Sequence, residues 1–447
     1  EDANINDDSC DYACHDNGDY SLYFDGDDDF VFVGDSDILD TISDQFSLFA
    51  EVKFSDISNQ GYVLSKRYYS QGPGYEIRVV NNILYAEVNP GGNAITLSSP
   101  IEIDNKFHTI LVTFQNNEFF RLYLDGVLVD DFGIDAIIGT NVESFSIPSL
   151  INNEPLVLGE FSSIDGRVLN GNIKKIGILN QSLSQIDIQS LMIDNYSFTI
   201  SNDLVAYYKF NAGEGNILYD HSGNGNHGTI YGATWTYDIP LHIGANLISF
   251  MSLPDDNSVS NVLSSLDGIA EGIIGEGVAA TANPVLGWVG SLTHISNQSG
   301  YWLKVNQDTD FYVTSENISD PDMLFSLNTG ANLISYPSGD NISLEDAIPS
   351  PENFNGIIGE GIAASANPVL GWVGSLTEFE PNHGYWFKVS EEMDFQYQYD
   401  STDELSRSIS TNEDKDYYQS SEQAFYFIED IENIEFNMLG FPNNEFT

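Results

Sequence analysis

Short segments in which hydrophobic and polar residues alternate follow one another from residue 18 to about residue 240. Turns rich in Gly, Asn and Asp separate them, and they include SLYFDG, DFVFVG, FSLFAEVKF, YEIRVV, HTILVTF and FFRLYLDG. A period of two between such turns predicts antiparallel β-strands at the spacing of a sandwich. The Asp125–Gly126 pair predicts a two-residue hairpin turn. One helix is expected in LSQIDIQSLMI, with Ser182 or Ser184 as its cap.

A second pattern is a tandem repeat, because residues 272–293 and 356–377 are almost identical. Only Val278/Ile362 and Thr281/Ser365 differ between GIIGEGVAATANPVLGWVGSLT and its copy. Each repeat is expected to open on an apolar strand, ANLISF or ANLISY, and to close on strands around YWLKV or YWFKV. Short helices are expected at residues 258–266 and 344–348 between them. A tandem copy favours a structural module or a multivalent binder over an active site, which is needed only once.

These patterns predict a mainly β chain in which an antiparallel sandwich precedes two small β-rich repeat domains. The expected segments are the end of a Cys/Asp-rich linker repeat at 1–17, the sandwich at 18–240, the two repeats at 241–318 and 319–400, and a polar linker with a terminal strand or the start of a further domain at 401–447.

The net charge of the chain limits the classes of molecule that it is expected to bind. The 68 acidic residues against 14 basic ones give a net charge of −54, which disfavours nucleic acid and anionic lipid. No apolar run reaches the roughly 18 to 20 residues of a membrane span, so we expect no membrane insertion. The polar start at residues 1–8 shows no signal peptide and is expected to be a mature or trimmed end. So acidic a surface suits either bound Ca²⁺ or adaptation to a salty medium, and the sequence favours neither.

Two loops are candidate calcium sites. Asp25, Asp27, Asp28 and Asp29 crowd into FDGDDDF, where like charges repel one another unless a cation or solvent screens them, and we expect Asp25, Asp27 and Asp28 as the ligands. Asp220, Ser222 and Asn224 alternate in DHSGNGN and supply oxygens at the spacing that begins a calcium loop, although no glutamate closes it. An exposed acidic turn and a plain Gly/Asn turn are the alternatives for these two loops.

Several ordered motifs resemble the LamG-like, or concanavalin A-like, jelly-roll family. They are SLYFDGDDDFVFV, FSLFAEVKF, FFRLYLDGVLV, PLVLGEF, LNGNIKKIGILNQSLSQIDI and LVAYYKFNAGEGNILYDHSGNGNHGTIYGATW. The resemblance implies a jelly roll for residues 18–240 and makes the two oxygen-rich loops reasonable places for a structural ion. The last motif usually opens such a domain but closes it here, which implies a permuted sandwich; a second, truncated domain is the alternative.

The same superfamily includes glycan hydrolases, so we searched for their residues. The laminarinase-like pattern E-x-D-x-x-E places two carboxylates on one strand. The nearest string runs from Glu102 through Asp104 to Phe107 and lacks the second glutamate. No HExxH, GxSxG or P-loop string appears either. We therefore expect no enzymatic activity.

Two further pairs of residues carry expectations. Trp288 and Trp372 lie in the duplicated block between glycines, and an exposed tryptophan there would contact a sugar or a protein partner. The alternative is that each fills the small core of its repeat. Cys10 and Cys14 are expected to form a local disulfide, although pairing with other segments, free thiols and a metal site stay open.

The start of the chain, the repeats and QAFYFIEDIE resemble segments of large secreted proteins of marine bacteria, which implies an extracellular or cell-surface location and a longer native polypeptide. Together these observations predict a non-catalytic structural or adhesive protein, a repeated subunit or stalk that contacts itself or neighbouring surface proteins. The alternative is a carbohydrate-binding protein that serves glycan capture or degradation.

Overall fold

The computed structural model describes residues 16–42, 44–68, 72–162, 166–193 and 203–399. Strands dominate these ranges, as predicted, and short antiparallel ladders join nearly all of them. Cys10, Cys14 and the terminal strand expected after residue 401 lie outside the described residues. None of the helices in the described ranges is long and apolar enough to cross a membrane.

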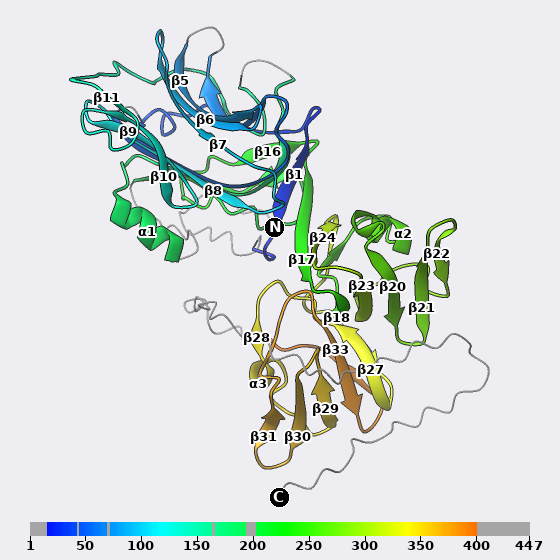
Figure 1. Ribbon diagram of the computed structural model, residues 1–447. Helices are drawn as coiled ribbons and strands as arrows, with labels where there is room; N and C mark the ends of the chain where they lie inside the picture. Colours follow the sequence, from blue (N-terminus) through cyan, green and yellow to red (C-terminus); the bar gives the residue numbers. More distant parts are fainter. Residues whose placement is uncertain (1–15, 43, 69–71, 163–165, 194–202, 400–447) are drawn as a thin grey trace, which may run out of the picture. The chain divides into compact units, whose positions relative to one another are not determined.

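Two sheets form the jelly roll (Figure 1). In hydrogen-bonded order the first contains β11 (Thr140–Asn141), β10 (Val127–Gly133), β9 (Phe119–Leu124), β8 (His108–Gln115), β3 (Gln45–Asp56), β13 (Asn170–Leu179), β1 (Ser21–Asp25), β17 (Thr234–Leu241) and β24 (Thr309–Thr314), with β14 (Leu204–Tyr208) also paired to β13. The second contains β15 (Ile217–Leu218), β16 (Gly228–Tyr231), β2 (Phe30–Gly34), β12 (Leu156–Leu158), β4 (Gly61–Arg67), β5 (Pro73–Val80), β6 (Ile83–Pro90) and β7 (Ile95–Pro100).

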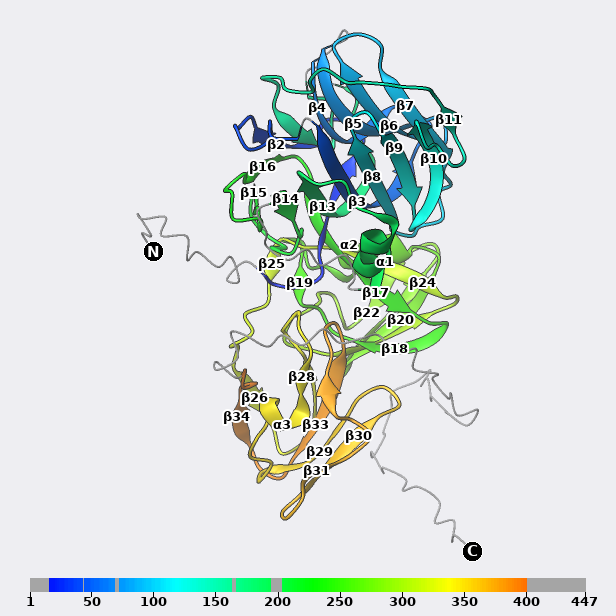
Figure 2. The same ribbon diagram turned by 90° about the vertical axis from the view of Figure 1, so that its left-hand side faces the viewer.

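Alternation along the strands fills the core between these sheets. In β5, Tyr75, Ile77 and Val79 enter the core, whereas Glu76 and Arg78 face the other way. The first sheet is covered on both faces, because the helix α1 (Gln185–Ile193) packs Ile188 against a second apolar cluster on its outer side (Figure 2). Ser184 caps α1 through its hydroxyl, which accepts a hydrogen bond from the Asp187 amide at 3.3 Å.

The closing segment from Leu204 to Leu241 belongs to this jelly roll. Its strand β14 pairs with β13, β16 pairs with β2, and β17 pairs with β1, so the segment completes both sheets. The prediction that the family's opening motif closes the same sandwich is thereby confirmed, and the truncated second domain is excluded. The predicted hairpin is also present, since Asp125 and Gly126 adopt φ values of 50° and 72° between β9 and β10.

The two repeats have the same sheet topology. Repeat 1 orders β18 (Gly244–Ile248), β23 (Tyr301–Val305), β20 (Ala270–Gly275), β21 (Val278–Asn283) and β22 (Gly287–Gly290); repeat 2 orders β27 (Gly330–Ser335), β33 (Gly384–Val389), β29 (Phe354–Ile358), β30 (Ala363–Asn367) and β31 (Gly371–Gly374). Two-stranded ladders complete them: β19 (Ser252–Leu253) with β25 (Asn317–Ile318), β26 (Phe325–Leu327) with β34 (Met393–Phe395), and β28 (Ile342–Ser343) with β32 (Glu378–Phe379).

The expected short helices of the repeats are present as α2 (Val259–Val262) with the 3₁₀ turn η2 (Ser264–Leu266), and as α3 (Leu344–Ala347). Ser258 and Ser343 cap them, accepting hydrogen bonds from the Asn261 and Asp346 amides. Repeat 1 is continuous with the jelly roll, because β17 pairs with β1 along one edge and with β24 of repeat 1 along the other. A single apolar cluster therefore runs from the jelly roll into repeat 1, whereas repeat 2 has its own.

Contacts between the repeats are reciprocal. A Glu360 carboxylate oxygen accepts a hydrogen bond from the Leu247 amide at 2.6 Å, and Glu276, the equivalent residue of repeat 1, accepts one from the Leu333 amide at 2.9 Å. The Ser249 amide donates to the Asn382 carbonyl at 2.8 Å, and the equivalent Ser335 amide donates to the Gln298 carbonyl at 3.3 Å. Exchange of equivalent contacts is the mark of a two-fold, isologous interface.

Two glycines occupy the middle of this interface. A Cβ atom added to Gly300 would lie 3.1 Å from the Cα of Gly384, and one added to Gly384 would lie 3.0 Å from the Cα of Gly300. A side chain at either position would push the repeats apart. The pairing surface of each repeat is thus closed by its sister, so it does not propagate from one repeat to the next as an open stacking surface would.

Candidate functional site

Four charged side chains gather on the outer face of the eight-stranded sheet, turned away from the core. We call Arg67 of β4, Glu76 and Arg78 of β5, and Glu87 of β6 the charged face. Glu76 and Glu87 are direct cross-strand partners, and Arg78 is the partner of Tyr85. The alternation that buries Tyr75, Ile77 and Val79 therefore brings these side chains together.

Each arginine of the charged face bridges both glutamates. Arg67 Nη1 lies 3.0 Å from Glu76 Oε2 and also donates to Glu87 Oε1. Arg78 Nε lies 2.9 Å from the other Glu76 oxygen, and Arg78 Nη2 lies 3.5 Å from Glu87 Oε2. The network fixes four long side chains in one geometry on rigid strands, which is how binding sites are preorganised.

Burial and ion pairing shift the pKa values of Glu76 and Arg78 in this network. The side chain of Glu76 is only 2% exposed, and burial raises the pKa of its carboxyl, an effect that Arg67 and Arg78 beside it only partly offset. Burial lowers the pKa of Arg78, but its pairs with Glu76 and Glu87 outweigh burial and raise that pKa overall. Both glutamates are held by arginines, so the arrangement suits hydrogen bonding to a ligand more than proton transfer.

Aromatic rings surround the charged face. The rings of Tyr62 and Phe161 are in tilted contact, with centroids 4.8 Å apart and planes at 54°, and the Arg78 guanidinium lies 4.4 Å above the ring of Tyr85. At the periphery, Gln60 Nε2 donates to Tyr62 Oη at 2.8 Å, and Thr96 Oγ1 donates to Glu87 at 3.2 Å. Planar polar groups beside aromatic rings are typical of small-molecule and glycan sites.

Sequence reasoning missed the charged face. The search for paired carboxylates assumed two residues on a single strand, whereas Glu76 and Glu87 face each other across the hairpin of β5 and β6. A useful signal was available in the composition: three of the five arginines of this acidic chain, Arg67, Arg78 and Arg167, lie on or beside this face. Glu102 and Asp104, examined instead, lie outside any strand.

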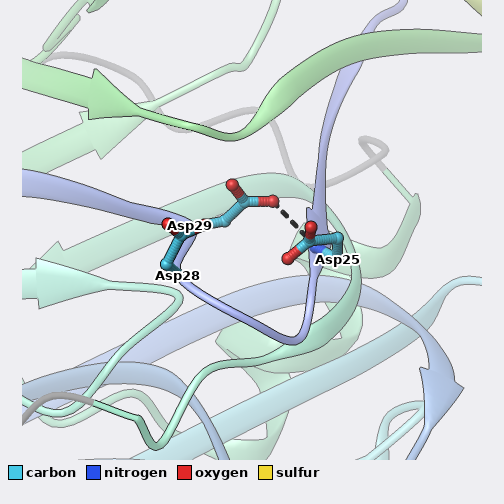
Figure 3. Close-up of side chains that lie close together, drawn as sticks. All are labelled: Asp25, Asp28 and Asp29. Carbon is cyan, nitrogen blue, oxygen red and sulfur yellow. Dashed lines mark hydrogen bonds between the residues drawn. The ribbon is translucent and has the colours of Figure 1, made fainter.

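The first predicted calcium loop brings together three aspartates, which we call the acidic loop: Asp25, Asp28 and Asp29. Figure 3 shows them around the turn between β1 and β2, and one carboxylate oxygen of each lies within 4.8 Å of the others. Asp29, only 5% exposed, takes the place in this group that we expected for Asp27. Its carboxylate accepts a hydrogen bond from the Asp25 amide at 2.8 Å.

An unpaired oxygen lies beside the acidic loop. Asn170 donates from Nδ2 to the Asp25 carbonyl at 3.0 Å, while its buried Oδ1 has no hydrogen-bond partner among the described residues. Burial and the neighbouring charges of Asp25 and Asp28 raise the pKa of Asp29, against the Asp25 amide, which lowers it. Carboxylates that repel one another next to a free amide oxygen fit the hard-oxygen chemistry of Ca²⁺.

The second predicted calcium loop has a different arrangement. Asp220 is fully buried, and its carboxylate accepts hydrogen bonds from the Tyr207, Ser222 and Asn226 amides at 2.9 Å each and from the Ser222 hydroxyl at 2.8 Å. Asn224 donates to the Leu204 and Val205 carbonyls at 2.8 and 3.0 Å. These bonds anchor the loop to β14, and an ion at Asp220 would have to displace them.

The duplicated block places its tryptophans partly inside. Trp288 packs against the core of repeat 1, and Trp372 donates from Nε1 to the Ile348 carbonyl at 3.0 Å. The most exposed apolar residues of the block lie at the hairpin tips between β21 and β22 and between β30 and β31, where Val285 and Val369 are each 86% exposed. Leu286 and Leu370 follow them, and Asn283 and Asn367 hold both turns with the same hydrogen bonds.

Comparison with known proteins places the jelly roll in a family. Residues 24–189 match the concanavalin A-like lectin/glucanases superfamily. No curated protein matches the chain.

Several solved structures are similar to it. A "putative carbohydrate binding protein" from Bacteroides ovatus shares 14% identity at a TM-score of 0.36, covering 49% of this chain and 60% of that one. The CBM40 of Ruminococcus gnavus IT-sialidase, bound to α2,3 sialyllactose, shares 15% identity at a TM-score of 0.26, covering 34% and 84%. A SAP-like pentraxin from Limulus polyphemus shares 14% at 0.31, covering 41% and 87%.

This chain thus spans less than two thirds of the Bacteroides protein. The family match and the two-sheet topology agree for this part of the chain. Residues 24–189 form a domain of the concanavalin A-like lectin/glucanase superfamily.

Proposed function

We propose that the chain is a carbohydrate-binding protein whose jelly roll holds glycan on the charged face. The observation that carries this proposal is the network in which Glu76 and Glu87 hold Arg67 and Arg78 beside the rings of Tyr62 and Tyr85. Sugar hydroxyls both donate and accept hydrogen bonds, so a neutral array of guanidinium and carboxylate groups complements them. Ring faces stack on the apolar faces of pyranoses.

Binding to a glycan array, followed by titration of the best ligand, tests this proposal. Tyr85→Ala should weaken the complex roughly tenfold, because it removes the ring under Arg78. Tyr231→Ala is the matched control, since this exposed tyrosine lies on β16 of the same sheet, with four strands between it and β6. Absence of any glycan ligand, or equal effects of the two variants, would contradict the proposal.

We also propose that the jelly roll does not hydrolyse glycans. The support is chemical: neither Glu76 nor Glu87 is free to act as an acid or a nucleophile while both arginines hold them. Pure protein should therefore release no reducing ends from laminarin, agar or related β-glucans. Release that Glu76→Gln or Glu87→Gln abolishes would overturn this proposal.

A second candidate function is adhesion or assembly at the outside of the cell. The two identical hairpin tips favour it, because each presents a pair of exposed aliphatic side chains on a rigid turn. Two equal contact points convert weak binding into avidity when both engage. An extracellular or cell-surface location, calcium at the acidic loop and a relation of the repeats to secreted marine bacterial proteins belong to this proposal.

A further inference from the structure

Repeat 2 carries a groove beside the end of α3. The groove has a volume of about 640 Å³ and runs between the end of α3 and the strand β34. Ile348, Ser350 and Phe354 line one side, and Met393, Phe395 and Tyr399 line the other. Leu324 lies at its rim and is 57% exposed. Its volume falls in the range typical of ligand sites.

In repeat 1 the 3₁₀ turn η2 stands at the corresponding place. There the turn η2 follows the helix, contacts β24, and holds it through a hydrogen bond from Ser265 Oγ to the Tyr312 carbonyl at 2.9 Å. Leu266 of that turn is 1% exposed. Repeat 2 replaces the turn with Pro349-Ser350-Pro351 and has no leucine between Ile348 and Phe354. The groove therefore lies beside the segment that replaces η2 and its buried Leu266 in the sister repeat.

The rim of the groove also corresponds to a covered surface. By the repeat offset, Leu324 is equivalent to Asp238, which pairs with Lys53 of the jelly roll at 2.9 Å. The strand β26 is equivalent to Ile239–Leu241 at the end of β17, whereas β1 pairs with β17 further upstream, at Thr234–Thr236. Among the described residues no third strand joins β26 and β34. Within the described residues, repeat 1 thus contacts the jelly roll through Asp238, at the position where repeat 2 has the exposed Leu324.

The charge of the groove selects its occupant. Asp322 and Asp394 line it, and no lysine, arginine or histidine lies among the described residues that do. The Asp394 carboxylate accepts only a hydrogen bond from Ser326 at 2.9 Å, and the Asp322 carboxylate one from Gln396 at 3.3 Å. A chain with a net charge of −54 is a poor partner for this surface, so a second copy is disfavoured.

We propose that this groove binds a segment of a partner protein that inserts a leucine-like side chain flanked by lysine or arginine. The aliphatic side chain takes the place that Leu266 fills in repeat 1, and the cations pair with Asp322 and Asp394. Apolar burial supplies affinity, and the charges select the partner.

Synthetic peptides built on the repeat 1 turn test this inference with the full chain. The cationic peptide KSSLKGI should bind in a titration followed by fluorescence anisotropy, whereas ESSLEGI and KSSAKGI should bind at least about tenfold more weakly. Ser350→Leu should abolish binding by filling the groove from within. Leu324→Asn and Asp394→Asn should each weaken binding roughly tenfold.

Matched controls are available for both substitutions. Leu370→Asn changes another exposed leucine of the same repeat, and Asp310→Asn changes the residue of repeat 1 that is equivalent to Asp394. Neither should alter the affinity for KSSLKGI. The proposal is overturned if the full chain does not bind this peptide, if ESSLEGI binds equally well, or if the control variants weaken binding as much as the groove variants do.

Discussion

At the scale of single residues, hydrogen bonding separates two loops that look alike in sequence. Asp220 accepts four hydrogen bonds from its own loop and from β14, whereas Asp25, Asp28 and Asp29 crowd together with few donors. A saturated buried carboxylate anchors backbone, and a poorly saturated cluster attracts a cation. The two loops therefore predict different responses to substitution and to calcium.

Asp220→Ala should lower the free energy of unfolding by about 3 kcal/mol, because it leaves several buried donors without an acceptor. Urea denaturation of the variant and the parent measures this change. Asp28→Ala is the control, since Asp28 is exposed. Measured in the presence of chelator, this substitution should lower the free energy of unfolding by less than about 0.5 kcal/mol. A similar loss in both variants would show that Asp220 does not anchor its loop.

Asp29 gives a test of calcium with a definite sign. Its pKa is raised in the folded state, so the folded chain holds that proton more tightly, and stability falls as pH rises from 3.8 through the raised pKa. In chelator at pH 7, Asp29→Asn should therefore be at least as stable as the parent. In calcium the parent should gain thermal stability by mass action, and the variant should gain less.

Thermal melts of the two proteins, in calcium and in EDTA at matched ionic strength, decide this point. If calcium raises the melting temperature of parent and variant equally, calcium does not bind at the acidic loop. No shift in either would leave adaptation to salt as the account of the acidic surface.

At the scale of elements, the repeats pair through equivalent residues with one difference. Glu360 also contacts His242 Nε2 at 2.5 Å, whereas the residue equivalent to His242 in repeat 2 is Asn328. Burial lowers the pKa of His242, but its hydrogen bonds to the Ile243 carbonyl and to Glu360 outweigh burial and raise that pKa above 6.5. One half of the interface is therefore sensitive to pH and the other half is not.

The stabilising effect of the His242–Glu360 pair should be complete below pH 6.5 and lost as pH rises through the raised pKa. Hydrogen exchange at the Leu247 amide, corrected for its intrinsic pH dependence, should be slower at pH 6 than at pH 8, and His242→Asn should remove that difference. Exchange at the Leu333 amide, which Glu276 holds, is the internal control. Equal pH dependence of the two amides would show that His242 does not act on the interface.

At the scale of the whole molecule, the closed pair of repeats changes the expectation of a stalk. An isologous surface is used up once two copies meet, so contacts between chains must come from other surfaces. The hairpin tips are the most exposed apolar part of the duplicated block, whereas Trp288 and Trp372 are partly buried. Self-association through the block is therefore expected to depend on Leu286 and Leu370.

Sedimentation velocity in calcium checks this expectation. If the tips make the contacts, Leu286→Ser with Leu370→Ser should abolish self-association and leave thermal stability nearly unchanged, because both side chains are exposed. Trp372→Ala is a poor probe of contacts, since loss of its packing should itself destabilise repeat 2 by about 3 kcal/mol. Unchanged association of the leucine double variant would rule out the tips.

The sequence by itself determined the local structure. Alternation predicted the strands, Asp125–Gly126 the hairpin, Ser184 the cap of α1, and near-identity the two repeats, because each of these depends on neighbours within a few residues. Its motifs also indicated the jelly roll and the permuted closing segment. The sequence predicted only part of the candidate metal site, since Asp25 and Asp28 lie together with Asp29 and not with Asp27.

Only the tertiary structure decided which distant residues meet. Cross-strand register places Glu76 opposite Glu87, the pairing of the repeats places Glu360 on the Leu247 amide, and folding of repeat 2 leaves a groove between α3 and β34. Register and domain pairing depend on packing summed over many long-range contacts, which no local pattern encodes. For that reason the strands could be predicted from the sequence, and the charged face and the groove could not.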